Sequence, residues 1–143
     1  AFLLYGVVAG IIIAIINTAV LFGVFPGTLP TGPLYNLAAV ISMLFGMFIA
    51  RKFAQRNPRK YGEAFSTAMF MVLGTIFRVS IMTLVNWTFL RFPTPVGFNM
   101  PEAAILIALP LIATFNATLA LYTIPLGYVA AKAVKVGTKI PIE

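Results

Sequence analysis

The stretch FLLYGVVAGIIIAIINTAVLFGV, from Phe2 to Val24, contains no charged side chain. At about 1.5 Å per helical residue it would extend roughly 34 Å, which is enough to cross the hydrocarbon core of a bilayer with some tilt. No basic segment precedes it, and its apolar part is longer than that of a signal peptide. The stretch therefore predicts a transmembrane helix.

The composition of the whole chain agrees with this interpretation. Of its 143 residues, 61% are hydrophobic and 9% are charged, and its mean hydropathy is +1.01. A soluble domain carries about 25% charged residues, so the chain is expected to be surrounded by a lipid bilayer. Cysteine and histidine are absent and there are three acidic residues. We therefore expect no catalytic centre, no metal site and no cofactor, and the chain is not predicted to be an enzyme.

The rest of the chain continues the pattern of apolar runs separated by loops. Pro110 divides the last run, so a short surface helix is expected at 102–109 and a spanning helix after it. The predicted fold is an all-α bundle of four transmembrane helices plus this short helix. The expected spans are 2–24, 35–50, 63–90 and 110–132, with outer loops at 25–34 and 91–101, a cytoplasmic loop at 51–62 and a cytoplasmic tail at 132–143.

The basic residues give the bundle a direction. Five of the ten lie between Arg51 and Lys60, and Lys132, Lys135 and Lys139 lie near the end of the chain. This clustering is typical of the cytoplasmic loops of membrane proteins and not of a nucleic-acid surface, so no nucleic-acid partner is expected. We predict a multi-pass protein of a prokaryotic plasma membrane with a cytoplasmic C-terminus.

Polar residues inside the apolar runs are the candidates for function. Thr75, Arg78, Met82 and Asn86 lie three or four residues apart and share one helical face, which should look into the bundle. An arginine near the membrane centre costs about 3 kcal/mol on insertion scales. Arg78 must therefore meet carbonyls, amides, an anionic ligand group or a partner protein.

Four asparagines are expected in the outer half of the bundle, beneath the loop that carries Phe98 and Asn99. An amide both donates and accepts, so such a cluster could read the edges of a heterocycle, with aromatic rings stacked on its faces. The alternative is that these amides bond to one another or cap helix ends. Trp87 has two interpretations as well, a stacking platform or an interfacial anchor. The four amides belong to Asn17, Asn36, Asn86 and Asn116.

Small residues three or four positions apart recur in the predicted spans. They let the backbones of membrane helices approach closely, so we interpret them as packing surfaces. The sets are Gly6, Gly10 and Ala14 in the first span, Ser42, Gly46 and Ala50 in the second, and Ala113, Ala117 and Ala120 in the fourth.

Three segments together resemble a known family. They read TGPLYNLAAVISMLFGMFIARK at 31–52, LGTIFRVSIMTLVNWTFL at 73–90 and LPLIATFNATLALYTIPLGYVAAKA at 109–133. Their order and spacing resemble the substrate-binding S component of energy-coupling factor (ECF) vitamin transporters, and the riboflavin-type subgroup in particular. The resemblance covers roughly residues 5–135, which would correspond to the last four helices of a six-helix fold, so it implies two further helices before them.

The resemblance implies a vitamin-binding membrane subunit without cofactors of its own. Such a subunit works with a transmembrane coupling protein and cytoplasmic ATPases, and binds its vitamin in the outer half. Asn86 and Asn116 match asparagines near that pocket. Where the riboflavin subgroup has a lysine and then a glycine, this chain has Leu119 and Ala120. The expected ligand is thus riboflavin or another small heterocyclic vitamin.

A second function fits the sequence features. Small-residue stripes, a lone interior arginine and few ionisable groups also suit a small structural or accessory subunit of a larger membrane complex, such as a respiratory assembly. An ion channel is not favoured, because no carboxylate lies in the middle of a predicted span.

Overall fold

The computed structural model describes residues 2–24, 29–56 and 63–138, and these form a bundle of four helices. Each helix is long and apolar enough to cross a membrane, which confirms the prediction of a multi-pass, all-helical membrane protein. The described residues contain no strand. The helices are α1 (Phe2–Val24), α2 (Gly32–Arg56), α3 (Glu63–Phe89) and α4 (Glu102–Thr138).

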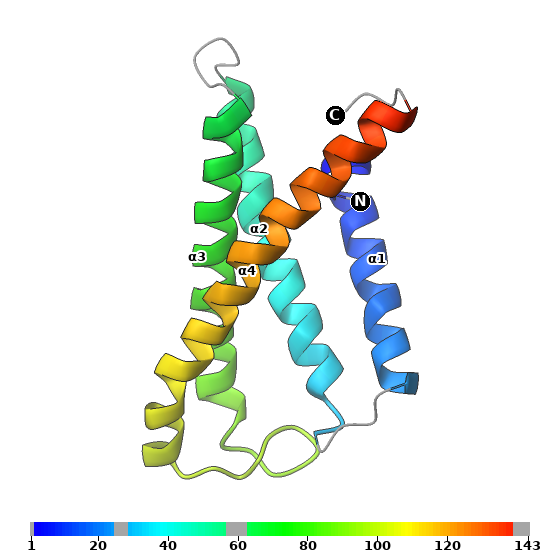
Figure 1. Ribbon diagram of the computed structural model, residues 1–143. Helices are drawn as coiled ribbons and strands as arrows, with labels where there is room; N and C mark the ends of the chain where they lie inside the picture. Colours follow the sequence, from blue (N-terminus) through cyan, green and yellow to red (C-terminus); the bar gives the residue numbers. More distant parts are fainter. Residues whose placement is uncertain (1, 25–28, 57–62, 139–143) are drawn as a thin grey trace.

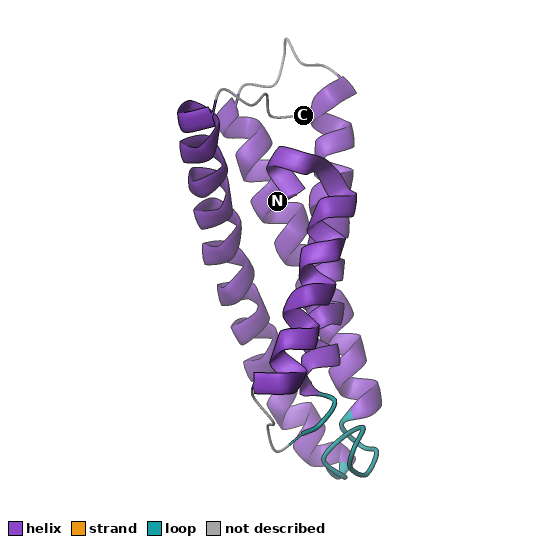
Figure 2. Cartoon of the chain, turned by 90° about the vertical axis from the view of Figure 1, so that its right-hand side faces the viewer, coloured by secondary structure: helices purple, strands orange, loops and turns teal. Residues whose placement is uncertain are grey.

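The four helices are packed unequally. α2 and α3 lie side by side, and α4 crosses them diagonally, starting beside α3 and ending near the first residues of α1 (Figure 1). α1 packs mainly on α2 and touches α4 only slightly. Figure 2 shows the same bundle turned by a quarter, with the connections at 29–31 and 90–101 gathered at one end. We call this the loop end.

The opposite end of the bundle is basic. Arg51 and Lys52 lie in the last turns of α2, and Lys132 and Lys135 lie in the last turns of α4. Both helices finish at the same end of the molecule (Figure 1). We call this the basic end.

The short surface helix expected at 102–109 is not present as a separate element. α4 runs without interruption from Glu102 to Thr138, with Pro110 and Pro125 inside it. A proline removes one intrahelical hydrogen bond, whereas ending a helix in lipid would leave several backbone groups without partners. The flanking alanines, leucines and isoleucines also tolerate a helix well. A helix that continues through Pro110 therefore costs less free energy than one that ends there.

The first span is broken near its start, which the sequence did not predict. Gly6 has a φ of 80° and a ψ of −174°, which a residue with a side chain rarely adopts. The first turn consequently folds back, and a Cβ on Gly10 would lie 3.2 Å from the Cβ of Phe2. Phe2 is thereby buried against the body of its own helix.

The tightest packing lies between α2 and α3, which we call the α2–α3 seam. A Cβ on Gly46 would collide with the carbonyl group of Leu73, so only glycine fits there. The rings of Phe45 and Phe77 meet edge to face, with their centroids 5.4 Å apart. The predicted stripe in the second span is confirmed, because Ser42, Gly46 and Ala50 are all buried.

The loop between α3 and α4 is tied to the start of α2. The Thr31 hydroxyl donates to the Pro95 carbonyl at 2.6 Å, and the Tyr35 hydroxyl donates to the Val96 carbonyl at 2.7 Å. A Cβ on Gly97 would collide with the carbonyl oxygen of Phe89. The loop is thus folded tightly over the ends of α2 and α3.

Candidate functional site

A groove opens where α1 separates from the rest of the bundle. α1, α2 and α4 together enclose about 290 Å³, and we call this space the α1 groove. Most of its lining is apolar. The lining residues are Phe2, Leu3, Gly10, Ile13, Ala14, Asn17, Val40, Met43, Leu44, Met47, Thr123, Ile124 and Gly127.

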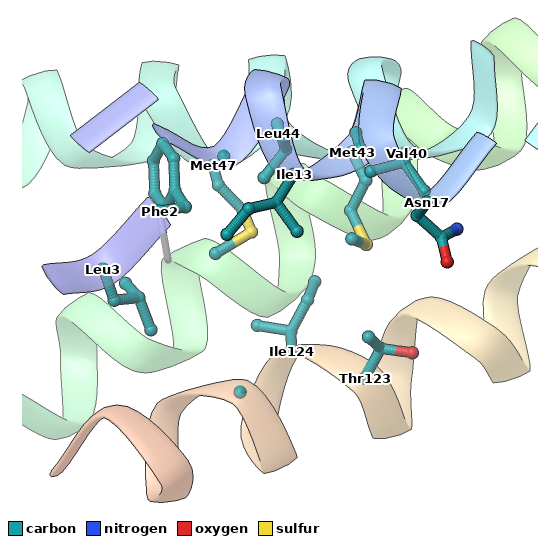
Figure 3. Close-up of a pocket in the computed structure, with 13 residues that line it drawn as sticks. Phe2, Leu3, Ile13, Asn17, Val40, Met43, Leu44, Met47, Thr123 and Ile124 are labelled. Carbon is teal, nitrogen blue, oxygen red and sulfur yellow. The ribbon is translucent and has the colours of Figure 1, made fainter. Parts of the chain in front are cut away.

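The α1 groove has one apolar end and one end with polar groups. Asn17, Met43 and Thr123 lie together at one end, while Phe2 and Leu3 lie at the other (Figure 3). Within the described residues, no hydrogen bond to the Asn17 side chain is present. The Thr123 hydroxyl donates to the Leu119 carbonyl of its own helix, which leaves the hydroxyl oxygen able to accept.

Arg78 is buried behind the wall of this groove and joins three helices. It is 5% exposed, and its Nε donates to Asn116 Oδ1 at 3.1 Å. Its Nη1 lies 3.9 Å from the Sδ of Met43, a weak acceptor. No carboxylate contacts it among the residues that the structure describes. The hydrogen-bond partner of Arg78 is therefore the side-chain amide of Asn116 on α4. An amide was one of the kinds of partner that the sequence analysis proposed for this arginine.

A second buried polar atom lies one turn before Arg78. Thr75 Oγ1 is shielded from solvent and has no hydrogen-bond partner within the described part of the chain. Asn116 in turn donates from Nδ2 to the carbonyl of Ile112 at 3.0 Å. The interior of the bundle thus contains a small polar cluster of Thr75, Arg78 and Asn116 in which the hydrogen-bonding capacity is only partly used.

The predicted inward face of the third span is present. Arg78 and Met82 are buried, and Thr75 and Asn86 are half-buried. The amide of Asn86, however, donates to the carbonyl of Met82 at 2.7 Å, four residues earlier on its own helix.

The asparagines expected to share an outer pocket do not line a common cavity in the part of the chain that the structure describes. Asn17 lines the α1 groove, Asn116 bonds Arg78, and none of the described cavities is lined by two of these four amides. Helical asparagines can bond the carbonyl four residues before them, as Asn86 and Asn116 do, and need no shared site. Asn36 is half-buried near the start of α2.

The remaining candidate residues lie at the exposed surface of the loop end. Trp87 is exposed, and the guanidinium of Arg91 stacks over its ring at 5.1 Å. Phe98 and Asn99 are exposed in the loop after α3, and Asn99 has a positive φ of 52°. Trp87 therefore has the surroundings of an interfacial anchor.

A second apolar cavity lies at the loop end, between α2, α3 and the loop after α3. Its volume is about 320 Å³, and its lining includes Tyr35, Phe89 and Val96. Neither this cavity nor the roles of Met43 and Thr123 in the groove were predicted. An inventory of acceptors for Arg78 would have pointed to Asn116, since a buried guanidinium needs an oxygen acceptor.

Comparisons with known proteins leave the resemblance to vitamin-binding S components as a prediction. No protein-family model, no curated protein and no solved structure matches this chain.

Proposed function

We propose that the chain is the membrane-embedded substrate-binding subunit of a vitamin uptake transporter. Its ligand would be riboflavin or another small heterocyclic vitamin, and a separate coupling protein with cytoplasmic ATPases would drive release. The supporting observation is the α1 groove, a space bounded by three helices and lined mainly by apolar groups with a few polar ones at one end.

The groove has the character of a small-molecule site. Ligand pockets usually measure about 300–1,000 Å³ and combine an apolar lining with a few polar groups that orient the ligand. At about 290 Å³ the α1 groove is close to the lower limit of that range. Because α1 packs mainly on α2, the face of α1 toward α4 makes few contacts with the rest of the bundle.

The charge distribution supports a definite orientation in the membrane. Arg51, Lys52, Lys132 and Lys135 all lie near the basic end. Basic side chains next to transmembrane helices favour the cytoplasmic side. In this orientation the C-terminus is cytoplasmic, the loop end faces outward, and the protein belongs in the plasma membrane of a prokaryote.

Equilibrium binding of a panel of B vitamins to the detergent-purified protein tests the proposal. We expect one vitamin to bind, and Asn17→Leu to weaken it about tenfold, as for the loss of one hydrogen bond. Asn86→Leu is the matched control, because Asn86 lies outside the groove and bonds its own helix. Weakening by Asn86→Leu alone would place the ligand elsewhere, in the outer amide region.

A second function has an observation of its own in its favour. Exposed apolar side chains cover long stretches of α1 and α4, with Val8 71%, Ile107 80% and Leu111 74% exposed. Such faces suit an accessory subunit whose neighbours are other membrane helices. Absence of binding for every vitamin, together with a defined larger complex in native mass spectrometry of solubilised membranes, would favour this accessory role.

A further inference from the structure

The guanidinium of Arg78 has more hydrogen-bonding capacity than its surroundings use. It carries five N–H donors, and an amide oxygen and a thioether sulfur account for two of them. The described residues offer it no further acceptor and no carboxylate. In an apolar interior the positive charge is screened far less than in water, so an anion brought near it would be strongly attracted.

Met43 separates this guanidinium from the α1 groove. Its side chain lines the groove, and its sulfur lies 3.9 Å from Nη1 of Arg78. Methionine is unbranched with three rotatable side-chain bonds, so it changes rotamer at low cost. A rotation that removes the sulfur from Nη1 would uncover Nη1 on the side of the groove that Met43 lines.

The groove around Met43 is graded in polarity. The Asn17 amide and the Thr123 hydroxyl lie at the same end as Met43, whereas the wall toward the other end is apolar and includes Phe2, Leu3 and Met47 (Figure 3). A molecule that fits this arrangement has an apolar body and a polar head at the Met43 end. Arginine binds carboxylates through paired hydrogen bonds, so a carboxylate is the head group that the cluster favours.

We propose that the α1 groove binds a small molecule with an apolar body and one carboxylate, which reaches Nη1 of Arg78 when Met43 turns aside. The amide of Asn17, at the same end of the groove, donates to the head group as well. This inference rests on the proposed function and deepens it, because it selects the acidic members of the vitamin class over neutral ones.

Matched acid and amide ligands test the inference. The purified protein, in a neutral detergent, is titrated with lipoate and lipoamide, with biotin and biotin amide, and with nicotinate and nicotinamide. We expect at least one acid to bind about tenfold or more tightly than its amide, as for a charge-assisted hydrogen bond. Equal affinities within every pair that binds would overturn the inference while leaving a vitamin binder in place.

Two methionine variants test whether the carboxylate of the ligand lies beside Arg78. Met43→Ala removes the side chain between the groove and Arg78, and we expect it to strengthen acid binding about threefold without strengthening amide binding. Met47→Ala is the matched control, because Met47 lines the same groove and its sulfur accepts no hydrogen bond from Arg78 in the described structure. Parallel shifts for acid and amide in both variants would show that the carboxylate does not reach Arg78.

Arg78→Gln tests whether the positive charge of Arg78 causes the preference for an acid over its amide. Thermal unfolding checks that the variant is folded. Loss of the acid preference in a folded variant supports the inference, and a retained preference overturns it. If Arg78→Gln does not fold, Met43→Phe decides instead, since a bulky ring keeps the guanidinium but blocks its approach. Met43→Phe should abolish the acid preference, and an unchanged preference would contradict the inference. If none of these acids and amides binds, the inference fails, and the separate panel of B vitamins decides whether the proposed function fails with it.

Discussion

The α2–α3 seam and the flank where α1 meets the bundle use the same kind of sequence pattern with different results. In the seam, Gly46 lies directly against the backbone of Leu73 and next to Gly74. On the flank, the nearest atoms to Gly10 belong to Phe2 of its own helix and to the side chain of Leu44. The seam is closed, and the flank leaves the α1 groove.

The difference shows that a stripe of small residues is not sufficient for close helix packing. Close approach requires the facing surface to be small as well, because backbone contact depends on both helices. Gly46 meets such a surface at Gly74, whereas Gly10 meets long side chains. Where only one side is small, the leftover space becomes a cavity that a ligand can use.

The largest loss of stability is expected from a substitution that disrupts the α2–α3 seam. Gly46→Ala places a methyl group against the Leu73 carbonyl and should separate α2 from α3, lowering the free energy of unfolding by about 3 kcal/mol. Gly23→Ala is the control, because a Cβ there meets nothing within 4 Å. Unfolding in denaturing detergent measures both variants, and equal stabilities would mean that the seam is not closely packed.

Breaking the hydrogen bond between Arg78 on α3 and Asn116 on α4 should give the next largest loss of stability. Asn116→Leu leaves Nε of Arg78 buried without its acceptor and should cost about 2 kcal/mol. Adding Arg78→Leu should restore most of that loss, because removing both partners together can be nearly neutral. A double-mutant cycle measures the coupling. Strictly additive losses would show that the two side chains do not interact.

The hydrogen bond between Tyr35 and the Val96 carbonyl at the loop end should contribute less to the free energy of unfolding. Tyr35→Phe removes the hydrogen bond to the Val96 carbonyl, with an expected loss of about 1 kcal/mol and faster amide exchange in the loop after α3. Tyr5→Phe on the exposed side of α1 serves as the control. Unchanged exchange in Tyr35→Phe would argue that the loop is held by its own backbone bonds.

The smallest effect is expected on the outer face of α1. Val8 is 71% exposed, and a lipid-facing side chain meets lipid both before and after the bundle assembles. Val8→Ala should therefore change stability by less than about 0.5 kcal/mol, whereas Ile105→Ala, at a fully buried position, should cost about 2 kcal/mol. A large loss from Val8→Ala would indicate that a protein neighbour covers this face.

Much of the fold follows from the sequence, because apolar runs of membrane length leave few alternatives to helices. The extent of the first span, although not its break at Gly6, was predictable from its length, and the inward position of Arg78 and Met82 from periodicity. The continuation of α4 through Pro110 was not, since a proline signals a boundary in water more strongly than in lipid.

The site was predictable only in part. The sequence identified Arg78 and Asn116 as polar residues in the membrane, but it did not pair them, because pairing depends on how α4 crosses α3. For Asn86 it left open a shared pocket or bonds to other amides and helix ends, and in the structure the Asn86 amide bonds a carbonyl on its own helix. Periodicity gives the face on which a side chain lies and does not choose between a partner across the bundle and one within the helix.

The uneven distribution of basic side chains has an electrical consequence. Arg51, Lys52, Lys132 and Lys135 lie in the last turns of α2 and α4, toward the same end of the bundle. An elementary charge carried across 100 mV costs about 2.3 kcal/mol, so inverting the protein against an inside-negative voltage would cost about 9 kcal/mol for these four charges alone. In the proposed orientation, with the basic end in the cytoplasm, a cell that maintains its voltage would therefore also hold the inserted protein in that orientation.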